Sequence, residues 1–387
     1  MVFKDILRVL YAPHKVFKDI IQNPRYLGAF IVLLLFVAAQ TGFYYSLYSK
    51  TYYEQTSPSG DELNMWTEDA TLWTASPEVT ISNNYVDFIN GTFFGNSSIQ
   101  FVQSDSNNVS MEITSFDSVS CGQTGFQNLS MRMKLVEPQT PPEQVTLYLY
   151  SLNPSNYFSY DLTSDISSIT TNVWKNLTVP VGSGNWLSSG DAEWENITGI
   201  KLDFTLPENS SFTLRVDGLF FRGIYQTPID TYGLTSYIYI LQSVFLQFLM
   251  KWLLITGLIY LIIKVLKGNV IWKPLMIAIG FALVITVVQA LVNTAASLTL
   301  PSLYYPIEYQ ANVVGEAQIT INAIVEASAL FSITNVIIEV AALVWITALC
   351  AIIVRSLTEF SWAKSILTSA TACIIAIIFL LPLISSL

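Results

Sequence analysis

Five long apolar runs set the first constraint on how this 387-residue chain can fold. They lie at residues 28–48, 240–263, 271–298, 333–354 and 366–384. Each has about the 20 residues that a helix needs to cross the hydrocarbon layer of a membrane. The charged fraction is only 12%, whereas soluble domains usually have about 25%. We therefore predict an integral membrane protein with a bundle of five transmembrane helices.

Basic residues predict which side of the membrane each connection occupies. Residues 1–27 hold two short basic amphipathic helices, broken near Pro13, that suit the surface of an anionic cytoplasmic leaflet. Two clusters of basic residues flank the later runs: Lys264, Lys267 and Lys273, then Arg355 and Lys364. Because positive charge favours the cytoplasmic side, we expect the N-terminus inside, and residues 49–226 and the C-terminus extracellular or luminal.

The region between the first two runs differs from the rest of the chain in charge. Residues 51–225 hold 6 Lys/Arg against 20 Asp/Glu, which argues against nucleic acid as a partner. The same region holds all seven Asn-x-Ser/Thr sequons of the chain: Asn90, Asn96, Asn108, Asn128, Asn176, Asn196 and Asn209. We therefore predict a glycoprotein whose acidic domain lies outside the cell or in a lumen.

Alternating short segments within this region predict an all-β fold. VTLYLY at 145–150 is one of several segments of β-branched and aromatic residues separated by Gly, Pro or Asn. Such spacing is typical of a β-sandwich or jelly roll, which we place at residues 49–226. Residues 227–387 then hold transmembrane helices 2–5, with a separate outer amphipathic helix near 313–330 packed under the sandwich.

The chain resembles the Yip family of membrane proteins, which are named for interaction with Ypt/Rab GTPases. The resemblance rests on YAPHKVFKDIIQNPRYLGAFIVLL at 11–34, with Pro13, Phe17 and Pro24, on ITGLIYLIIKVLKGN at 255–269, and on FSWAKSI at 360–366. It implies five spans and a GTPase partner. The connection between the first two spans is short in typical members, but here it holds about 175 residues.

Residues 173–225 resemble the closing half of galactose-binding-like jelly rolls, the fold of many carbohydrate-binding modules. The matching positions are Trp194, Ile197, Ile200, Asp217, Gly218 and Leu219. The resemblance implies a sandwich domain that binds sugar. The same fold also serves adhesion, protein interaction and spacing.

Aromatic side chains in or near predicted loops are the candidates for sugar binding, because flat rings stack on the apolar faces of sugars. The candidates are Trp186, Trp73, Tyr157, Tyr160 and Trp174. Trp186, flanked by Gly184, Asn185 and Ser188, is the residue that we expect to be most exposed. The alternative is that these rings close the sandwich core.

We expect no catalytic residues and no cofactor, with one alternative for a metal. The single histidine, His14, lies in the predicted cytoplasmic segment, which excludes a His-based nucleophile or metal cluster in the outer domain. Asp217, with Asp87 or Glu112, is the candidate for a structural Ca²⁺ site. The alternative is a solvated acidic surface.

Two charged residues fall within predicted spans. Lys251 and Glu339 each cost at least ~2.5 kcal/mol to insert if unpaired. They lie 13 and 16 residues before the basic ends Lys264 and Arg355, at similar depths of roughly 20–24 Å. We predict a structural ion pair. The alternatives are a polar path that includes Gln289 and Asn293, or a charge that reaches the outer interface.

These features lead to two hypotheses for function. In the first, a non-enzymatic cell-surface protein binds a glycan or an envelope protein through its outer domain, with the bundle in contact with membrane lipid as anchor and platform for a larger assembly. In the second, the bundle organises the membrane, acts as a scaffold or transports a solute through Lys251 and Glu339. We expect an archaeal cell membrane, with a eukaryotic endomembrane as the alternative.

Overall fold

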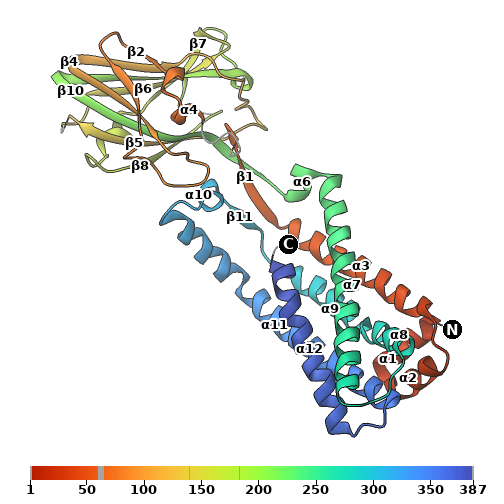
Figure 1. Ribbon diagram of the computed structural model, residues 1–387. Coiled ribbons are helices and arrows are strands. Elements are labelled where there is room, and N and C mark those ends of the chain that lie inside the picture. Colours follow the sequence, from red (N-terminus) through yellow and green to blue (C-terminus); the bar gives the residue numbers. More distant parts are fainter. Residues whose placement is uncertain (1, 60–64, 139, 183, 386–387) are drawn as a thin grey trace. The chain divides into compact units, whose positions relative to one another are not determined.

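The computed structural model describes the chain except residues 1, 60–64, 139, 183 and 386–387, and except the side chains of residues 105, 106, 208, 209 and 381–385. The chain forms two compact units, a helical unit and a β unit. The helical unit contains residues 1–52, 227–303 and 325–387, and the β unit contains residues 53–226 and 304–324. Each unit is described by itself (Figure 1).

The helical unit is the predicted bundle. Its helices are α1 (Val2–Tyr11), α2 (Pro13–Gln22), α3 (Tyr26–Tyr48), α6 (Pro228–Tyr232), α7 (Leu234–Val265), α8 (Trp272–Ala282), α9 (Val284–Ser297), the larger part of α11 (Glu316–Leu357), and α12 (Trp362–Ser385). Among the described residues, five stretches are long and apolar enough to cross a membrane: α3, α7, α8 with α9, α11 and α12. The prediction of five spans is confirmed.

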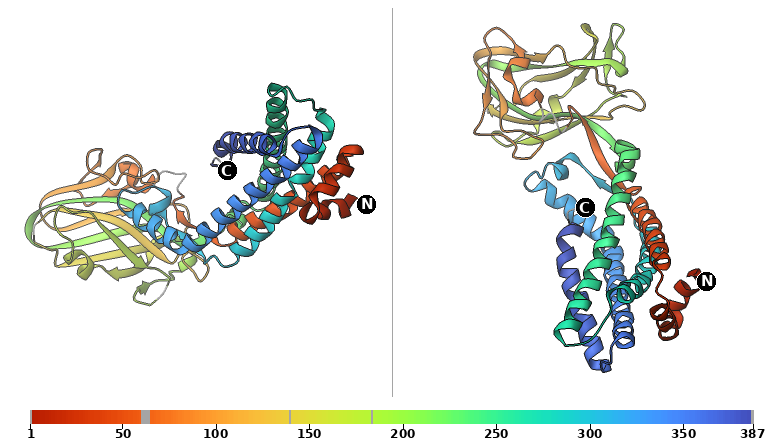
Figure 2. Two further views of the ribbon diagram at one scale, coloured as in Figure 1. Left: turned by 90° about the horizontal axis from the view of Figure 1, so that it is seen from below. Right: turned by 45° about the vertical axis from the view of Figure 1, so that its right-hand side comes forward.

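Small residues let the helices of this unit approach closely. A Cβ atom added at Gly280 in α8 would lie 2.6 Å from the Cβ of Ala29 in α3 and 2.9 Å from the ring of Trp252 in α7. The Trp252 indole also donates a hydrogen bond to the Met276 carbonyl at 2.7 Å. Close approach of this kind is how helices pack in lipid, where burial of apolar surface gives little driving force. Figure 2 shows these helices from two further directions.

The segment near residues 313–330 differs from the prediction. We expected an amphipathic helix separate from the fourth span, but α11 is one continuous helix of 42 residues. Nothing in its sequence ends it, because residues 316–357 contain neither glycine nor proline. Residues 304–324 belong to the β unit, so this unit is not the single stretch 49–226 that we predicted.

The β unit is a sandwich organised around two long strands, β4 (Ser98–Ile113) and β10 (Ile197–Gln226). They pair antiparallel along most of their length, with register shifts around residues 205–212 of β10. On its other side, β10 pairs first with β6 and then with β5. The remaining strands are β1 (Thr51–Ser57), β2 (Thr74–Ala75), β3 (Thr80–Asn84), β5 (Asn128–Glu137), β6 (Gln144–Ser151), β7 (Asn153–Asp161), β8 (Lys175–Pro180), β9 (Leu187–Ser189) and β11 (Leu303–Tyr305).

The long strands contribute to both layers of the sandwich (Figure 1). One layer has the order β9, β7, β6, β10, β4 and β2, and the other has β8, β5, β10, β4 and β3. Alternate residues of β10 point into the core. The even-numbered residues do so both before and after the register shifts. These buried residues are Ile200, Leu202, Phe204, Phe212, Leu214 and Val216. The predicted fold class, a five-helix bundle with an all-β sandwich, is confirmed.

The glycine contact in the bundle generates a prediction. Gly280→Ala should destabilise the full-length protein by about 1–3 kcal/mol, because the new methyl group overpacks the crossing with α3. The matched control is Gly257→Ala in α7, where an added Cβ meets no atom within 4 Å. Thermal melting in detergent should show a lower Tm for Gly280→Ala only; equal melting of the two variants would contradict this packing.

Candidate functional site

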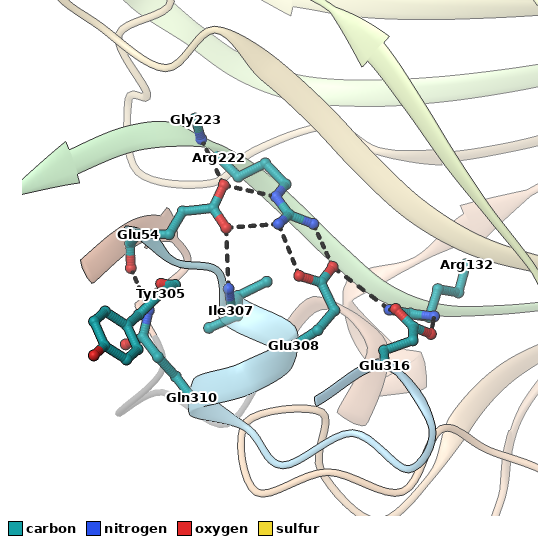
Figure 3. A network of polar contacts seen from close by, with 9 residues as sticks. All are labelled: Glu54, Arg132, Arg222, Gly223, Tyr305, Ile307, Glu308, Gln310 and Glu316. Atoms are coloured by element: carbon teal, nitrogen blue, oxygen red, sulfur yellow. Dashed lines mark hydrogen bonds and ion pairs between the residues drawn. The ribbon is translucent and has the colours of Figure 1, made fainter. Parts of the chain in front are cut away.

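A buried ion network ties the connection between the third and fourth spans to the sandwich (Figure 3). Arg222 of β10 donates to both oxygens of Glu54 in β1, at 2.9 and 2.6 Å. It also donates to both oxygens of Glu308 in α10 (Ile307–Gln310), at 2.5 and 2.9 Å. The three side chains are at most 12% exposed, so these charges are largely removed from water.

A second arginine extends the network. Arg132 of β5 binds Glu316 at the start of α11 with two parallel hydrogen bonds of 2.6 and 2.8 Å. It also lies 3.6 Å from Glu308 and over the ring of Phe94. A carboxylate in the first turn of a helix is favoured by the helix dipole. The network therefore fixes both α10 and the start of α11.

Electrostatics keep the network charged. Burial by itself would raise the pKa of Glu308, but hydrogen bonds and charge from Arg222, with the charge of Arg132, hold that pKa below its usual range. Burial would likewise lower the pKa of Arg222, but Glu308 and Glu54 raise it. Glu54 also accepts backbone N–H groups of Ile307 and Gly223 at 3.0 and 3.2 Å. These contacts hold α10 against β1 and β10.

A hollow of about 500 Å³ lies in the β unit, partly walled by the segment that the network holds. Its walls are three aromatic rings, two carboxamides and two aliphatic side chains: Tyr53, Phe93, Tyr309, Gln310, Asn312, Ala317 and Ile321. Tyr305 supports two of the rings, because its ring centroid is 5.0 Å from that of Tyr53 and 5.0 Å from that of Tyr309. The sequence gives no local signal for this hollow, because Tyr53 and Phe93 lie more than 200 positions before its other five residues.

Three predicted aromatic residues, Tyr157 and Tyr160 of β7 and Trp186 just before β9, lie partly exposed elsewhere in the β unit. Trp186 is half-buried, with its ring centroid 5.1 Å from that of Tyr160 and 5.5 Å from that of Trp194. Its indole N–H donates to the Pro180 carbonyl at 2.8 Å. Tyr157 is half-buried and packs edge-on against Tyr148. Trp186, Tyr157 and Tyr160 stay candidates for ligand contact.

Two other predicted aromatic residues have structural partners. Trp73 is only 4% exposed and packs against Phe101, so its predicted role at a sugar-binding surface is wrong. Trp174 is half-buried, and its indole donates to Asp87 at 2.9 Å. The physical reason for the correction is that the ring of Trp73 closes the core, where its N–H reaches the Trp66 carbonyl at 2.6 Å.

The candidate Ca²⁺ ligands have other partners. Asp217 is buried and accepts N–H groups of Ile89 and Gly218, while desolvation raises its pKa to about 8. Asp87 is paired with Lys134 at 2.8 Å and with Arg215, and Glu112 accepts the Tyr150 hydroxyl at 2.6 Å. No group of three or more His, Cys, Asp or Glu suited to a metal occurs in the described part of the chain. The Ca²⁺ site stays a prediction.

The sequons differ in exposure. Asn90, Asn96, Asn108 and Asn176 are exposed. Asn128 and Asn196 are half-buried, and Asn196 donates its amide to Glu193 at 3.0 Å. The side chain of Asn209 lies outside the described residues. These four positions are therefore the most exposed of the described sequon side chains.

The two charged residues of the bundle line one cavity. Lys251 of α7 and Glu339 of α11 share a space of about 80 Å³ with Gln289 of α9 and Cys373 of α12. Glu339 is close enough to act electrostatically on Lys251, yet these two described residues form no direct salt bridge within 4.0 Å. The two residues line one cavity and interact electrostatically, so the structural ion pair between the second and fourth spans stays a prediction. Asn293, the other residue of the predicted path, is buried and is not part of this cavity lining.

Comparison with known families agrees with the architecture of the bundle. The Yip1 domain model matches residues 182–384, more than half of the chain. The chain belongs to the Yip1 domain family. The match contains the last four of the five candidate spans of this Yip1-domain protein and begins within the sandwich, so the N-terminal part of the predicted resemblance lies outside it. No curated protein matches the sequence.

Solved structures share only weak similarity with this Yip1-domain protein. A family 11 carbohydrate-binding module of a Clostridium thermocellum cellulase has 13% identity and a TM-score of 0.27, covering 39% of this chain and 86% of that chain. A β-1,2-glucanase from Parabacteroides distasonis has 15% identity and a TM-score of 0.28, covering 38% and 22%. TM-scores this low do not establish a common fold, so the sandwich assignment rests on the strand pairing described above.

The ion network predicts a large effect of one substitution. Arg222→Met should destabilise the β unit by about 3–5 kcal/mol, because it leaves Glu54 buried without its countercharge and Glu308 with only Arg132, at 3.6 Å. The matched control is Lys201→Met, whose partner Asp203 is 33% exposed and which should cost at most about 1 kcal/mol. Denaturant unfolding of the full-length protein, followed by tryptophan fluorescence, measures both.

Acid provides a second measurement of the same contact. The pKa of Glu308 is lower in the folded protein than in the unfolded chain, so its stabilisation is present at neutral pH and is lost as pH falls below about 4.3 through the folded value. Glu308→Gln should therefore flatten the pH dependence of Tm on the acid side. An unchanged acid slope in this variant would contradict the assignment.

Proposed function

We propose that this Yip1-domain protein is a non-enzymatic, membrane-anchored receptor whose β unit binds glycan. The observation that carries the proposal is the hollow in which rings of Tyr53, Phe93 and Tyr309 face the same space as the carboxamides of Gln310 and Asn312. Rings stack on sugar C–H faces, and a carboxamide can both donate to and accept from hydroxyl groups. The Gln310 amide already donates to the Glu54 and Tyr305 carbonyls, each at 3.0 Å, so Gln310 offers its oxygen as an acceptor and Asn312 is the candidate donor. The lining contains no charged side chain, which favours a neutral ligand.

The proposal places the β unit outside the cytoplasm. The basic residues near the spans support this orientation, since Lys264, Lys273 and Arg355 all flank connections on the side opposite to the β unit in the five-span topology. The exposed sequons support it too, because glycosylation occurs on secreted or luminal surfaces. The proposal also places the protein in a plasma membrane, so that the β unit lies on the cell surface.

The structure offers two surfaces for sugar, and one experiment separates them. Full-length protein in detergent is applied to a glycan array as wild type, Tyr309→Ala, Trp186→Ala and Tyr85→Ala. Tyr85 is 71% exposed but contributes neither to the hollow nor to the cluster around Trp186, so it controls for loss of any surface ring. We expect Tyr309→Ala alone to reduce binding, by about tenfold, since stacked rings contribute roughly 1 kcal/mol or more.

Other outcomes have defined meanings. Loss of binding in Trp186→Ala, with Tyr309→Ala unaffected, would move the site to the cluster around Trp186. No glycan binding by correctly folded wild-type protein would overturn the sugar proposal. Recovery of an envelope protein by crosslinking in native membranes would then support a protein-binding role.

The shared cavity of Lys251 and Glu339 favours a second candidate function, in which the bundle moves a charged or polar solute. A double-mutant cycle of Lys251→Met and Glu339→Gln tests whether the two charges form one functional unit. We expect the double variant to be more stable than Lys251→Met alone, because that substitution leaves Glu339 as an uncompensated charge. Additive changes in Tm, with no change in solute flux into proteoliposomes, would remove this candidate.

A further inference from the structure

A pocket of about 350 Å³ lies within the helical unit, between the end of α3 and the start of α7. Four of its nine lining residues are tyrosines and three are serine or threonine, and none carries a charge. The residues that matter most are Tyr44 and Tyr48 of α3, and Thr235, Ser236, Tyr239 and Ser243 of α7. This pocket is distinct from the sugar site proposed above, because it belongs to the other unit.

The lengths of the helices place this pocket at the level of lipid headgroups. α7 has 32 residues and is therefore ~48 Å long, whereas the hydrocarbon core is ~30 Å thick. Counting about 20 residues back from the basic end at Lys264 reaches Val244. Ser243 and the pocket residues before it therefore lie at the outer edge of the hydrocarbon layer and beyond it.

Local contacts hold the corner between α6 and α7 in place. Thr227 caps α6 by accepting the N–H of Asp230, and the Asp230 carboxylate in turn accepts from the Thr227 side chain at 2.7 Å. Gly233, at φ +53°, joins the two helices, and the Ser236 hydroxyl donates back to the Pro228 carbonyl at 3.1 Å. The wall of the pocket is thus formed without a ligand, which reduces the cost of ordering on binding.

Charge selects the kind of headgroup. An ionised phosphate would find no cation among the nine lining residues. Lys50, the cation nearest in sequence to Tyr48, already donates to the Leu298 carbonyl at 2.7 Å. Most of the pocket surface is apolar, so the tyrosine rings would contact the faces of a sugar, and the few exposed tyrosine and serine hydroxyls would bind its hydroxyl groups.

We propose that this pocket binds a membrane glycolipid with an uncharged sugar headgroup. The sugar lies among the tyrosine and serine hydroxyls, and the upper part of the lipid chain runs along the apolar side that includes Ile240. Such a lipid would hold the end of α3 against the start of α7.

Native mass spectrometry of the full-length protein tests the proposal. The protein is released from nanodiscs that contain equal amounts of monoglucosyl-diacylglycerol, phosphatidylglycerol and phosphatidylcholine. We expect glycolipid adducts to exceed phosphatidylglycerol adducts by about fivefold, as one additional hydrogen bond would give. Ser243→Leu fills the pocket and should abolish the preference for glycolipid. The control Gln242→Leu also introduces a leucine, but at an exposed neighbouring position outside the lining, and should keep the preference.

A gentler variant protects the test against misfolding. Thr235→Val together with Tyr239→Phe removes two hydroxyl groups with little change in shape, and should lower the glycolipid preference while Tm in detergent stays unchanged. Equal adducts of all three lipids on the wild type would overturn the proposal, as would a preference for phosphatidylglycerol. A glycolipid preference that survives Ser243→Leu would overturn it as well, because the lipid would then bind elsewhere.

Discussion

The Arg222 guanidinium, held between Glu54 and Glu308, is the contact around which the β unit is completed. Removing three charged groups from water is costly, and only reciprocal hydrogen bonds of good geometry offset that cost. Here both oxygens of each carboxylate face the fork of the arginine. Because the three residues come from β1, β10 and α10, the contact adds residues 304–324 to a sandwich that would otherwise be one uninterrupted insertion.

This addition creates the hollow that we propose as the sugar site. Tyr309, Gln310 and Asn312 reach the wall only because the network and the small apolar cluster of Ile307, Ala311 and Val313 hold their segment against Phe94 and Phe220. The ion network and the candidate sugar site are therefore parts of one arrangement. A truncated chain of residues 53–226 would lack five of the seven lining residues and would leave Arg132 and Arg222 without Glu316 and Glu308.

The helical unit combines a family architecture with polar features of its own. Four of its five candidate spans lie within the Yip1-domain match, while the long connection between the first two spans carries the sandwich. Within the bundle, Lys251, Gln289 and Glu339 gather around one small cavity. Tyrosines of α3, α6 and α7 line another pocket, between the end of α3 and the start of α7. Polar groups in lipid are costly unless they have partners, so both places are where function beyond anchoring is expected.

The sequence alone determined the number of spans, the β character of the central region and the depth match of Lys251 and Glu339, because each depends on residue spacing along one stretch. The absence of glycine and proline from residues 316–357 also indicates one continuous α11. Hydropathy alone suggested two separate segments, because the first part of this helix is more polar than the second. Only the tertiary structure decided that Trp73, among the candidate aromatic residues, lies in the core of the sandwich. The same holds for the pairing of Arg222 with Glu308 and for the hollow that Tyr53 shares with Tyr309. The physical reason is that buried charge pairing and ring packing join residues far apart in the chain, and a single sequence carries no local pattern for such contacts.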